Sequence, residues 1–166
     1  MADEAMPVNE NTALSADQWK ALVGFEVGIS SWIKIDQSLI SDFAEVTGDQ
    51  QFIHVDPARA KAESPYGGTV AHGFLTLGLL PAMARDALPA MQGVRARINY
   101  GFDRVRFLAP VPAGARVRAR FRLLQAEERR PQELTFKYDV TVEIEGSNTP
   151  ALVAQWLSRA LFAEAP

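Results

Sequence analysis

RVRARFRLL, at residues 116–124, alternates arginine with apolar residues through its first eight positions. Because successive side chains of a β-strand point to opposite faces, this pattern predicts a strand with one buried face and one solvated face. The buried face would carry Val117, Ala119, Phe121 and Leu123. The opposite face would carry Arg116, Arg118, Arg120 and Arg122.

The same alternation recurs in LTFKYDVTVEI at residues 134–144. Its apolar set is Leu134, Phe136, Tyr138, Val140, Val142 and Ile144. ALVAQWLSRALF (151–162) and INYGFDRVRFL (98–108) are further strand candidates, and the turn-like segments EERRPQ and EGSNTP separate the last three strands. Together these stretches predict an antiparallel sheet with one buried face.

The run GFLTLGLLPAMA at residues 73–84 is the natural cover for that face. It predicts a helix over roughly 70–88 that is apolar almost all round, as in a helix buried in a core. Pro81 is expected to disturb its hydrogen-bond ladder. The run is shorter than the roughly 20 residues of a membrane span. The predicted fold class is therefore α+β, a curved antiparallel sheet wrapped round a long central helix.

Length and composition bound the function. The 166 residues suggest one domain, and the net charge of −3 argues against nucleic acid as the main partner. The absence of cysteine excludes disulfides, a thiolate nucleophile and a cysteine-type zinc site. The first twelve residues, MADEAMPVNENT, lack the basic and apolar regions of a secretory signal. We expect a cytoplasmic protein without a membrane partner.

Before the sheet, the sequence predicts short helices. SADQWKALVG (15–24) has Ser15 as a cap, DQSLISDFAEVTG (36–48) runs from Asp36 to Gly48, and DPARAKAES (56–64) starts at Asp56. FEVGISSWIKI (25–35) is strand-like, and DQQFIH (49–54) lies in a connection between helices. We expect an N-terminal extension with a short helix, residues 1–24, and a single domain, residues 25–166.

One carboxylate and one imidazole lie close together in that connection. Asp49 and His54 are separated by four residues, and His54 is one of only two histidines in the chain. The spacing permits a catalytic pair that deprotonates water and returns the proton. It equally permits a turn in which Asp49 caps the backbone and His54 is a satisfied polar residue.

Three blocks in order resemble the MaoC-like dehydratases, also called R-specific enoyl-CoA hydratases or hydratase 2 proteins, and within them the NodN-like branch. The blocks are FAEVTGDQQFIHVDPARA, with Phe43, Gly48, Asp49, His54 and Ala60 at the motif positions, then AHGFL (71–75), then NYGFDRVRFLAPVPAG (99–114). The resemblance covers roughly residues 25–160.

The resemblance implies a hot-dog fold and a hydro-lyase that acts on acyl-CoA, or on acyl-carrier-protein thioesters, in fatty acid metabolism. Asp49 and His54 would activate water, and the backbone N–H of Gly73 would bind the thioester oxygen. No metal and no further cofactor is implied. A departure is Gln51-Phe52, where the family usually has Asn-Pro, which puts loop geometry and substrate shape in doubt.

Gln51 is a further predicted substrate-binding residue. The other candidates have two interpretations each. Phe52, Tyr66 and Phe74 would line the substrate site or serve the core, and His72 would contact substrate or be structural. The arginines at 116–122, with Arg104 and Arg106, would bind coenzyme A phosphates or form a solvated face.

The alternatives to a hydratase are a hot-dog thioesterase and a non-catalytic acyl-thioester-binding partner subunit. Because an open sheet leaves an unpaired edge, we also expect a homodimer or higher homo-oligomer, with strands 116–124 and 134–144 in the joined sheet.

Overall fold

A six-stranded antiparallel sheet forms the body of the protein in a computed structural model that describes residues 13–162. The expectation about a signal segment at residues 1–12 lies outside the described residues. The strands are β1 (Glu26–Ile29), β2 (Ile33–Lys34), β3 (Val94–Phe107), β4 (Arg116–Arg130), β5 (Glu133–Ile144) and β6 (Leu152–Phe162). Their order is β1-β4-β5-β6-β3, and β2 also pairs with β4.

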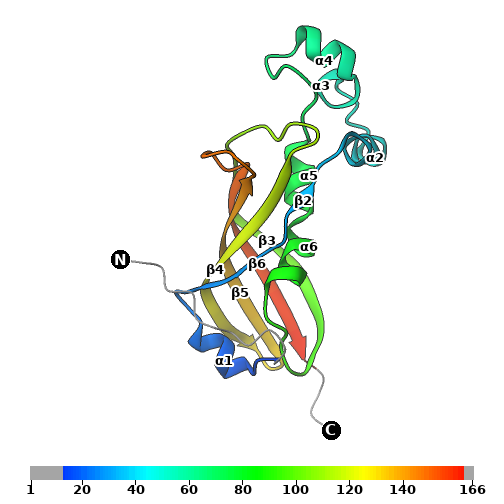
Figure 1. The fold of residues 1–166 in the computed structure, drawn as a ribbon. Helices are drawn as coiled ribbons and strands as arrows, with labels where there is room; N and C mark the ends of the chain where they lie inside the picture. Colours follow the sequence, from blue (N-terminus) through cyan, green and yellow to red (C-terminus); the bar gives the residue numbers. More distant parts are fainter. Residues whose placement is uncertain (1–12, 163–166) are drawn as a thin grey trace.

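The helices are α1 (Ala16–Ala21), α2 (Gln37–Thr47), α3 (Phe52–Val55), α4 (Pro57–Glu63), α5 (Gly73–Gly78) and α6 (Leu80–Ala87). The sheet curves along α5 and α6, while α2, α3 and α4 gather beyond one end of it and α1 lies at the other (Figure 1). This arrangement confirms the predicted α+β, hot-dog architecture.

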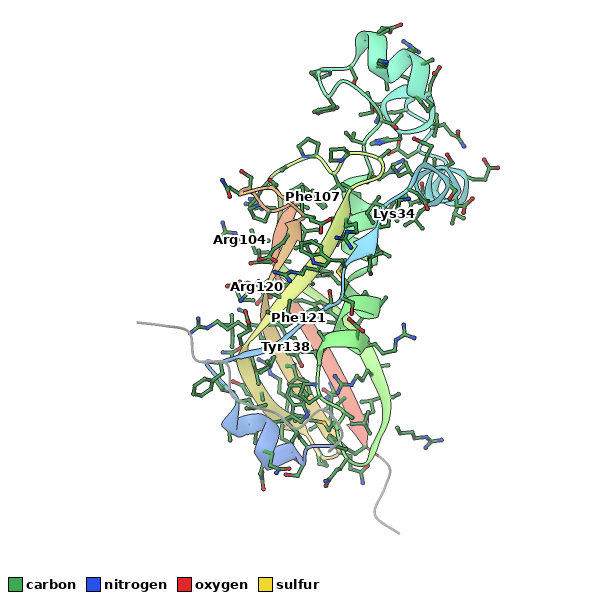
Figure 2. The ribbon with its side chains drawn as sticks, viewed as in Figure 1. Lys34, Arg104, Phe107, Arg120, Phe121 and Tyr138 are labelled. Atoms are coloured by element: carbon green, nitrogen blue, oxygen red, sulfur yellow. The ribbon has the colours of Figure 1, made fainter. Side chains whose placement is uncertain are left out.

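The alternation in β4 and β5 places the side chains as the sequence predicts. The four residues of β4 and the six of β5 that were predicted to face the core are all buried. Phe121, Tyr138 and Trp156 contact one another through their rings, with Tyr138 and Trp156 centroids 5.8 Å apart. Phe121 and Tyr138 lie along the body of the sheet, and Phe107 lies at the end of β3 beside α5 (Figure 2).

The central helix is not continuous. It begins at Gly73 rather than Val70 and is divided at Leu79, between α5 and α6. Pro81 explains the division, since it has no N–H for the carbonyl of Leu77 and its ring crowds the preceding turn. The prediction of one helix over 70–88 was therefore wrong in continuity, although the apolar run does cover the sheet.

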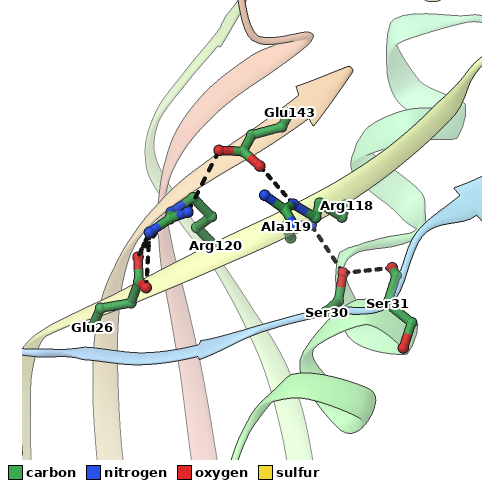
Figure 3. Close-up of polar contacts among 7 residues, drawn as sticks. All are labelled: Glu26, Ser30, Ser31, Arg118, Ala119, Arg120 and Glu143. Carbon is green, nitrogen blue, oxygen red and sulfur yellow. Dashed lines mark hydrogen bonds and ion pairs between the residues drawn. The ribbon is translucent and has the colours of Figure 1, made fainter. Parts of the chain in front are cut away.

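Two further segments differ from the sequence prediction. The stretch 25–35 forms two short strands, β1 and β2, separated by residues 30–32, which have no regular structure. Ser30 fills the gap, because its Oγ accepts a hydrogen bond from Ala119 N at 2.9 Å and its N–H donates to Ala119 O at 2.9 Å (Figure 3). The connection 49–54, expected to be irregular, contains the one-turn helix α3.

Helix α1 is joined to the core. Ser15 and Gln18 form the expected capping box, and Trp19 is 0% exposed with its ring 5.4 Å from that of Phe136. An indole buried against β5 shares the hydrophobic core with the sheet, so α1 contributes to the stability of residues 25–162.

Replacing Trp19 by alanine should therefore lower the free energy of unfolding by about 3–5 kcal/mol, the usual cost of truncating a buried aromatic residue. Val23→Ala, a half-exposed position just after α1, should change it by no more than about 0.5 kcal/mol. Urea denaturation measures both. A loss below about 1 kcal/mol for Trp19→Ala would show that α1 is an appendage.

Candidate active site

Two hydrogen bonds join the segment around His54 to Val70, on the approach to α5. The N–H of Val70 donates to the carbonyl of Ile53 at 3.0 Å, and His54 Nδ1 donates to the carbonyl of Val70 at 2.6 Å. Because a carbonyl only accepts, the His54 proton lies on Nδ1. His54 Nε2 is then the ring nitrogen left to accept a proton.

Local sequence places the two members of the pair. Helix α2 ends at Gly48, which has a left-handed φ of 75° that suits glycine, and the chain turns there to present Asp49 at the surface. His54 lies in the one-turn helix α3 and is buried, with 7% exposure. Asp56 ends this turn and caps α4 through Arg59 N, at 2.9 Å.

Gln37, at the start of α2, links His54 to Thr69 through its side-chain amide, a contact that the sequence did not predict; we call this link the Gln37 brace. Its Nε2 donates to the carbonyl of His54 at 2.7 Å, and its Oε1 accepts from Thr69 Oγ1 at 2.5 Å. Thr69 precedes Val70, the acceptor of the His54 ring. A side-chain amide thus closes a ring of hydrogen bonds around the backbone and the imidazole of His54.

His72 lies against both members of the pair. Its Nε2 donates to the backbone carbonyl of Asp49 at 2.9 Å, and its ring stacks on that of His54 with centroids 3.7 Å apart. His72 is 3% exposed and does not line the cavity described next. The predicted contact of His72 with substrate is therefore not supported by its position in the single chain.

A cavity of about 270 Å³ adjoins His54, and Asp49 is not among its lining residues. Its walls come from α3, from α5 and its approach, and from the segment that follows β3. His54, Tyr66 and Gly73 are the predicted site residues among the lining, which also includes Ile53, Thr76, Phe107 and Leu108. The structure thus brings a histidine, an apolar wall and the start of α5 together at one opening.

Gly73 is the first residue of α5, as the resemblance implies for the oxyanion position. The first N–H groups of a helix have no acceptor within it, and they carry partial positive charge. A Cβ at Gly73 would lie 2.9 Å from the ring of Phe107. Glycine therefore lets the Phe107 side of the cavity close against the helix start.

The remaining predicted residues lie around this opening. Phe74 is 68% exposed and its ring meets that of Phe107 edge-on at 5.6 Å. Phe52 is half-buried beneath the guanidinium of Arg59, 4.1 Å from the ring centroid, and Gln51 is exposed. None of these three lines the cavity in the single chain, so their contact with substrate stays a prediction.

Asp49, His54 and His72 each offer a ligand atom within 4.8 Å of the others, close enough to raise the question of a metal ion. The two imidazole planes, however, stack at only 26° to each other. A ring nitrogen's lone pair lies in the plane of its ring, so stacked rings direct their lone pairs along nearly parallel lines. This geometry disfavours an ion shared by the two rings.

Three arginines of the β4 ladder have carboxylate partners on the outer face of the sheet. Arg116 binds Glu145, Arg118 binds Glu143 at 2.6 Å, and Arg120 binds Glu26 at 2.9 Å (Figure 3 shows the last two). The hydrogen bond from Arg116 lowers the pKa of Glu145 and in turn raises the pKa of Arg116. These pairs favour the structural interpretation of the ladder.

Arg104 and Arg106 lie near the end of β3, opposite Gln155 and Val153 of β6. Both are exposed, and neither has a carboxylate partner among residues 13–162. They remain the better candidates for coenzyme A phosphates.

A larger cavity, of about 560 Å³, lies at the opposite end of β3 from Phe107. It is lined by the end of α6, the loop after it and the start of β3, with Trp156 and Ser158 of β6. None of Asp49, His54 or Gly73 lines it. Size alone would choose this cavity, but the predicted site residues His54, Tyr66 and Gly73 line the smaller one.

A known protein family matches most of this chain. Residues 19–144 match the MaoC like domain. The chain belongs to the MaoC-like dehydratase family, and its fold is the hot-dog fold.

Among curated proteins, "Nodulation protein N" of Rhizobium meliloti is 53% identical over 149 residues, which cover 90% of this chain and 92% of that protein. "3-hydroxyacyl-thioester dehydratase Z" of Mycobacterium tuberculosis is 47% identical, with 84% and 91% covered. Among solved structures, R-hydratase PhaJ1 from Pseudomonas aeruginosa superposes with a TM-score of 0.62 at 24% identity, covering 86% of this chain and 90% of that one. That structural likeness shows the fold.

The Gln37 brace can be tested by stability. Gln37→Leu leaves the carbonyl of His54 and the hydroxyl of Thr69 without their partner, which should lower the free energy of unfolding by about 1–3 kcal/mol. Gln125→Leu, the same exchange at an exposed position of β4, should change it by less than about 0.5 kcal/mol. Equal effects in urea denaturation would contradict the brace.

Proposed function

We propose that this protein reversibly adds water to a trans-2-enoyl thioester of coenzyme A and gives the R-3-hydroxyacyl thioester. The observation that carries the proposal is the orientation of His54. Its Nδ1 proton is committed to Val70, and its ring lines the same cavity as the start of α5. Dehydratase names among the relatives support the same class of reaction.

The chemistry follows from these positions. Asp49 and His54 hold a water molecule, and His54 Nε2 takes a proton from it as its oxygen bonds to C3. The electrons of the C2–C3 double bond move toward the thioester, whose oxygen becomes negative. The proton is returned at C2, so atoms and charge balance over the cycle.

The developing charge is then met at the helix start. We propose that the N–H of Gly73 donates to the thioester oxygen, where it adds to the partial positive charge of the first turn. Removing one such donor from an oxyanion site typically costs about 10²–10³ in rate. The reaction needs no redox cofactor and, in this scheme, no metal.

Purified protein should remove the enoyl absorbance of crotonyl-CoA, with the R-hydroxy ester as product. Asp49→Asn and His54→Ala should each lower turnover by about 10² or more, the usual size of an acid–base contribution. Asp42→Asn, an exposed carboxylate of α2 outside the site, should keep wild-type turnover.

Near-normal turnover in both dyad variants would contradict the assignment of the pair. Release of free coenzyme A without a hydroxyacyl product would indicate the thioesterase alternative. Inactivity of the pure chain that a second protein restores would indicate a partner subunit.

We further propose that the active unit is a homodimer. Among the described residues, β3 pairs only with β6, so the other edge of this 14-residue strand presents unpaired backbone groups. Ile98, Tyr100 and Phe107 are exposed apolar residues of the same strand. Light scattering should give twice the mass of one chain or a multiple of it, and a fully active monomer would contradict the proposal.

A further inference from the structure

His72 touches both residues of the proposed catalytic pair but does not reach the cavity. Its Nε2 binds the backbone carbonyl of Asp49 at 2.9 Å, and its ring lies 3.7 Å from the ring of His54. Phe43 of α2 makes another ring contact with it, at 5.0 Å between centroids. One buried side chain therefore fixes the exit of α2, where Asp49 lies, and the plane of the His54 ring.

The hydrogen bonds assign the proton of each imidazole. His72 donates from Nε2, because its partner is a carbonyl, and its Nδ1 is buried without a hydrogen-bond partner among the described residues. His54 donates from Nδ1 to Val70. The two stacked rings thus carry opposite tautomers, each fixed by a backbone carbonyl.

We propose that His72 is a positioning residue that sets the separation and orientation of Asp49 and His54, through its hydrogen bond to one and its ring stacking on the other. The inference rests on the proposed function, since it concerns the geometry of that pair. His72 is 3% exposed and does not line the cavity, which agrees with an indirect role rather than a substrate contact. Misplacement of a catalytic group by about 1 Å can cost about 10² in rate.

Two substitutions separate the two contacts. His72→Phe keeps an aromatic ring against His54 and removes the donor to Asp49. His72→Gln keeps an amide N–H within reach of the Asp49 carbonyl and removes the ring. Each should lower kcat for crotonyl-CoA hydration about 10-fold or more and leave KM within about 2-fold, because the substrate-lining residues are untouched.

Val140→Ala is the matched control for lost stability. Val140 is fully buried in β5, away from the pair, so its truncation destabilises the fold without moving Asp49 or His54. Assayed well below its unfolding midpoint, it should keep wild-type kcat. A fall in kcat equal to that of the His72 variants would attribute their loss to stability alone and overturn the proposal.

Histidine ¹⁵N NMR gives a readout independent of turnover, because the chain has only two histidines. The wild-type spectrum should show one ring protonated at Nδ1 and the other at Nε2, and only the Nδ1-protonated ring should remain in both variants. The His54 ring signals should stay near wild type in His72→Phe and shift in His72→Gln, which lacks the stacked ring.

Wild-type His72 protonated at Nδ1 would overturn the proposal, and this result does not depend on whether a variant folds or can be assayed. His54 signals that stay unchanged in His72→Gln would also overturn it. Wild-type protein that shows both tautomers but no hydration would instead refute the proposed function and keep the contact.

Discussion

The hydrogen bond from His54 Nδ1 to the carbonyl of Val70 is the contact on which the site depends. It fixes which nitrogen can accept a proton, and it ties α3 to the strand-like approach to α5. That approach is itself pinned to the loop before β4, since Ala71 N donates to Val111 O at 2.8 Å and Ala113 N to Thr69 O at 2.9 Å. The imidazole is therefore located by backbone that continues directly into the sheet.

The sheet supplies the rigidity for this arrangement. Its buried face is continuous through β4, β5 and β6, and its outer face is held by arginine–carboxylate pairs. The helices α2, α3 and α4 stand beyond the end of the sheet (Figure 1), and α2 joins the hydrophobic core through the fully buried Ile40. Gln37 and His72 add side-chain contacts in this region. Gln37 binds the carbonyl of His54 and the hydroxyl of Thr69, and His72 binds the carbonyl of Asp49 and stacks on His54. Among residues 13–162, none of the helices has the length and hydropathy of a membrane span.

Periodicity predicted most of this fold because burial follows it closely. The alternation at 116–124 and 134–144 corresponds to a buried face and a more accessible one, apart from the buried Thr135, and the caps at Ser15, Asp36 and Asp56 lie where the sequence places them. The break at Leu79 was harder to place, since an apolar run does not reveal where a proline divides a helix. The spacing of Asp49 and His54 left both a catalytic pair and a capped turn open, and the predicted role of Gly73 came only from the family motif. Gln37 and Thr69 were missed because their partners are backbone carbonyls and each other, which leave no pattern along the chain.

The central claim is that the site adds water to C3 of an enoyl thioester. Turnover of crotonyl-CoA in H₂¹⁸O, followed by mass spectrometry, tests it most directly because the label marks the carbon that water attacks. The account predicts an intact coenzyme A ester with ¹⁸O in its 3-hydroxyl group, formed by the wild type and about 10² or more times slower by His54→Ala. Label found only in the carboxylate of a released free acid would contradict it.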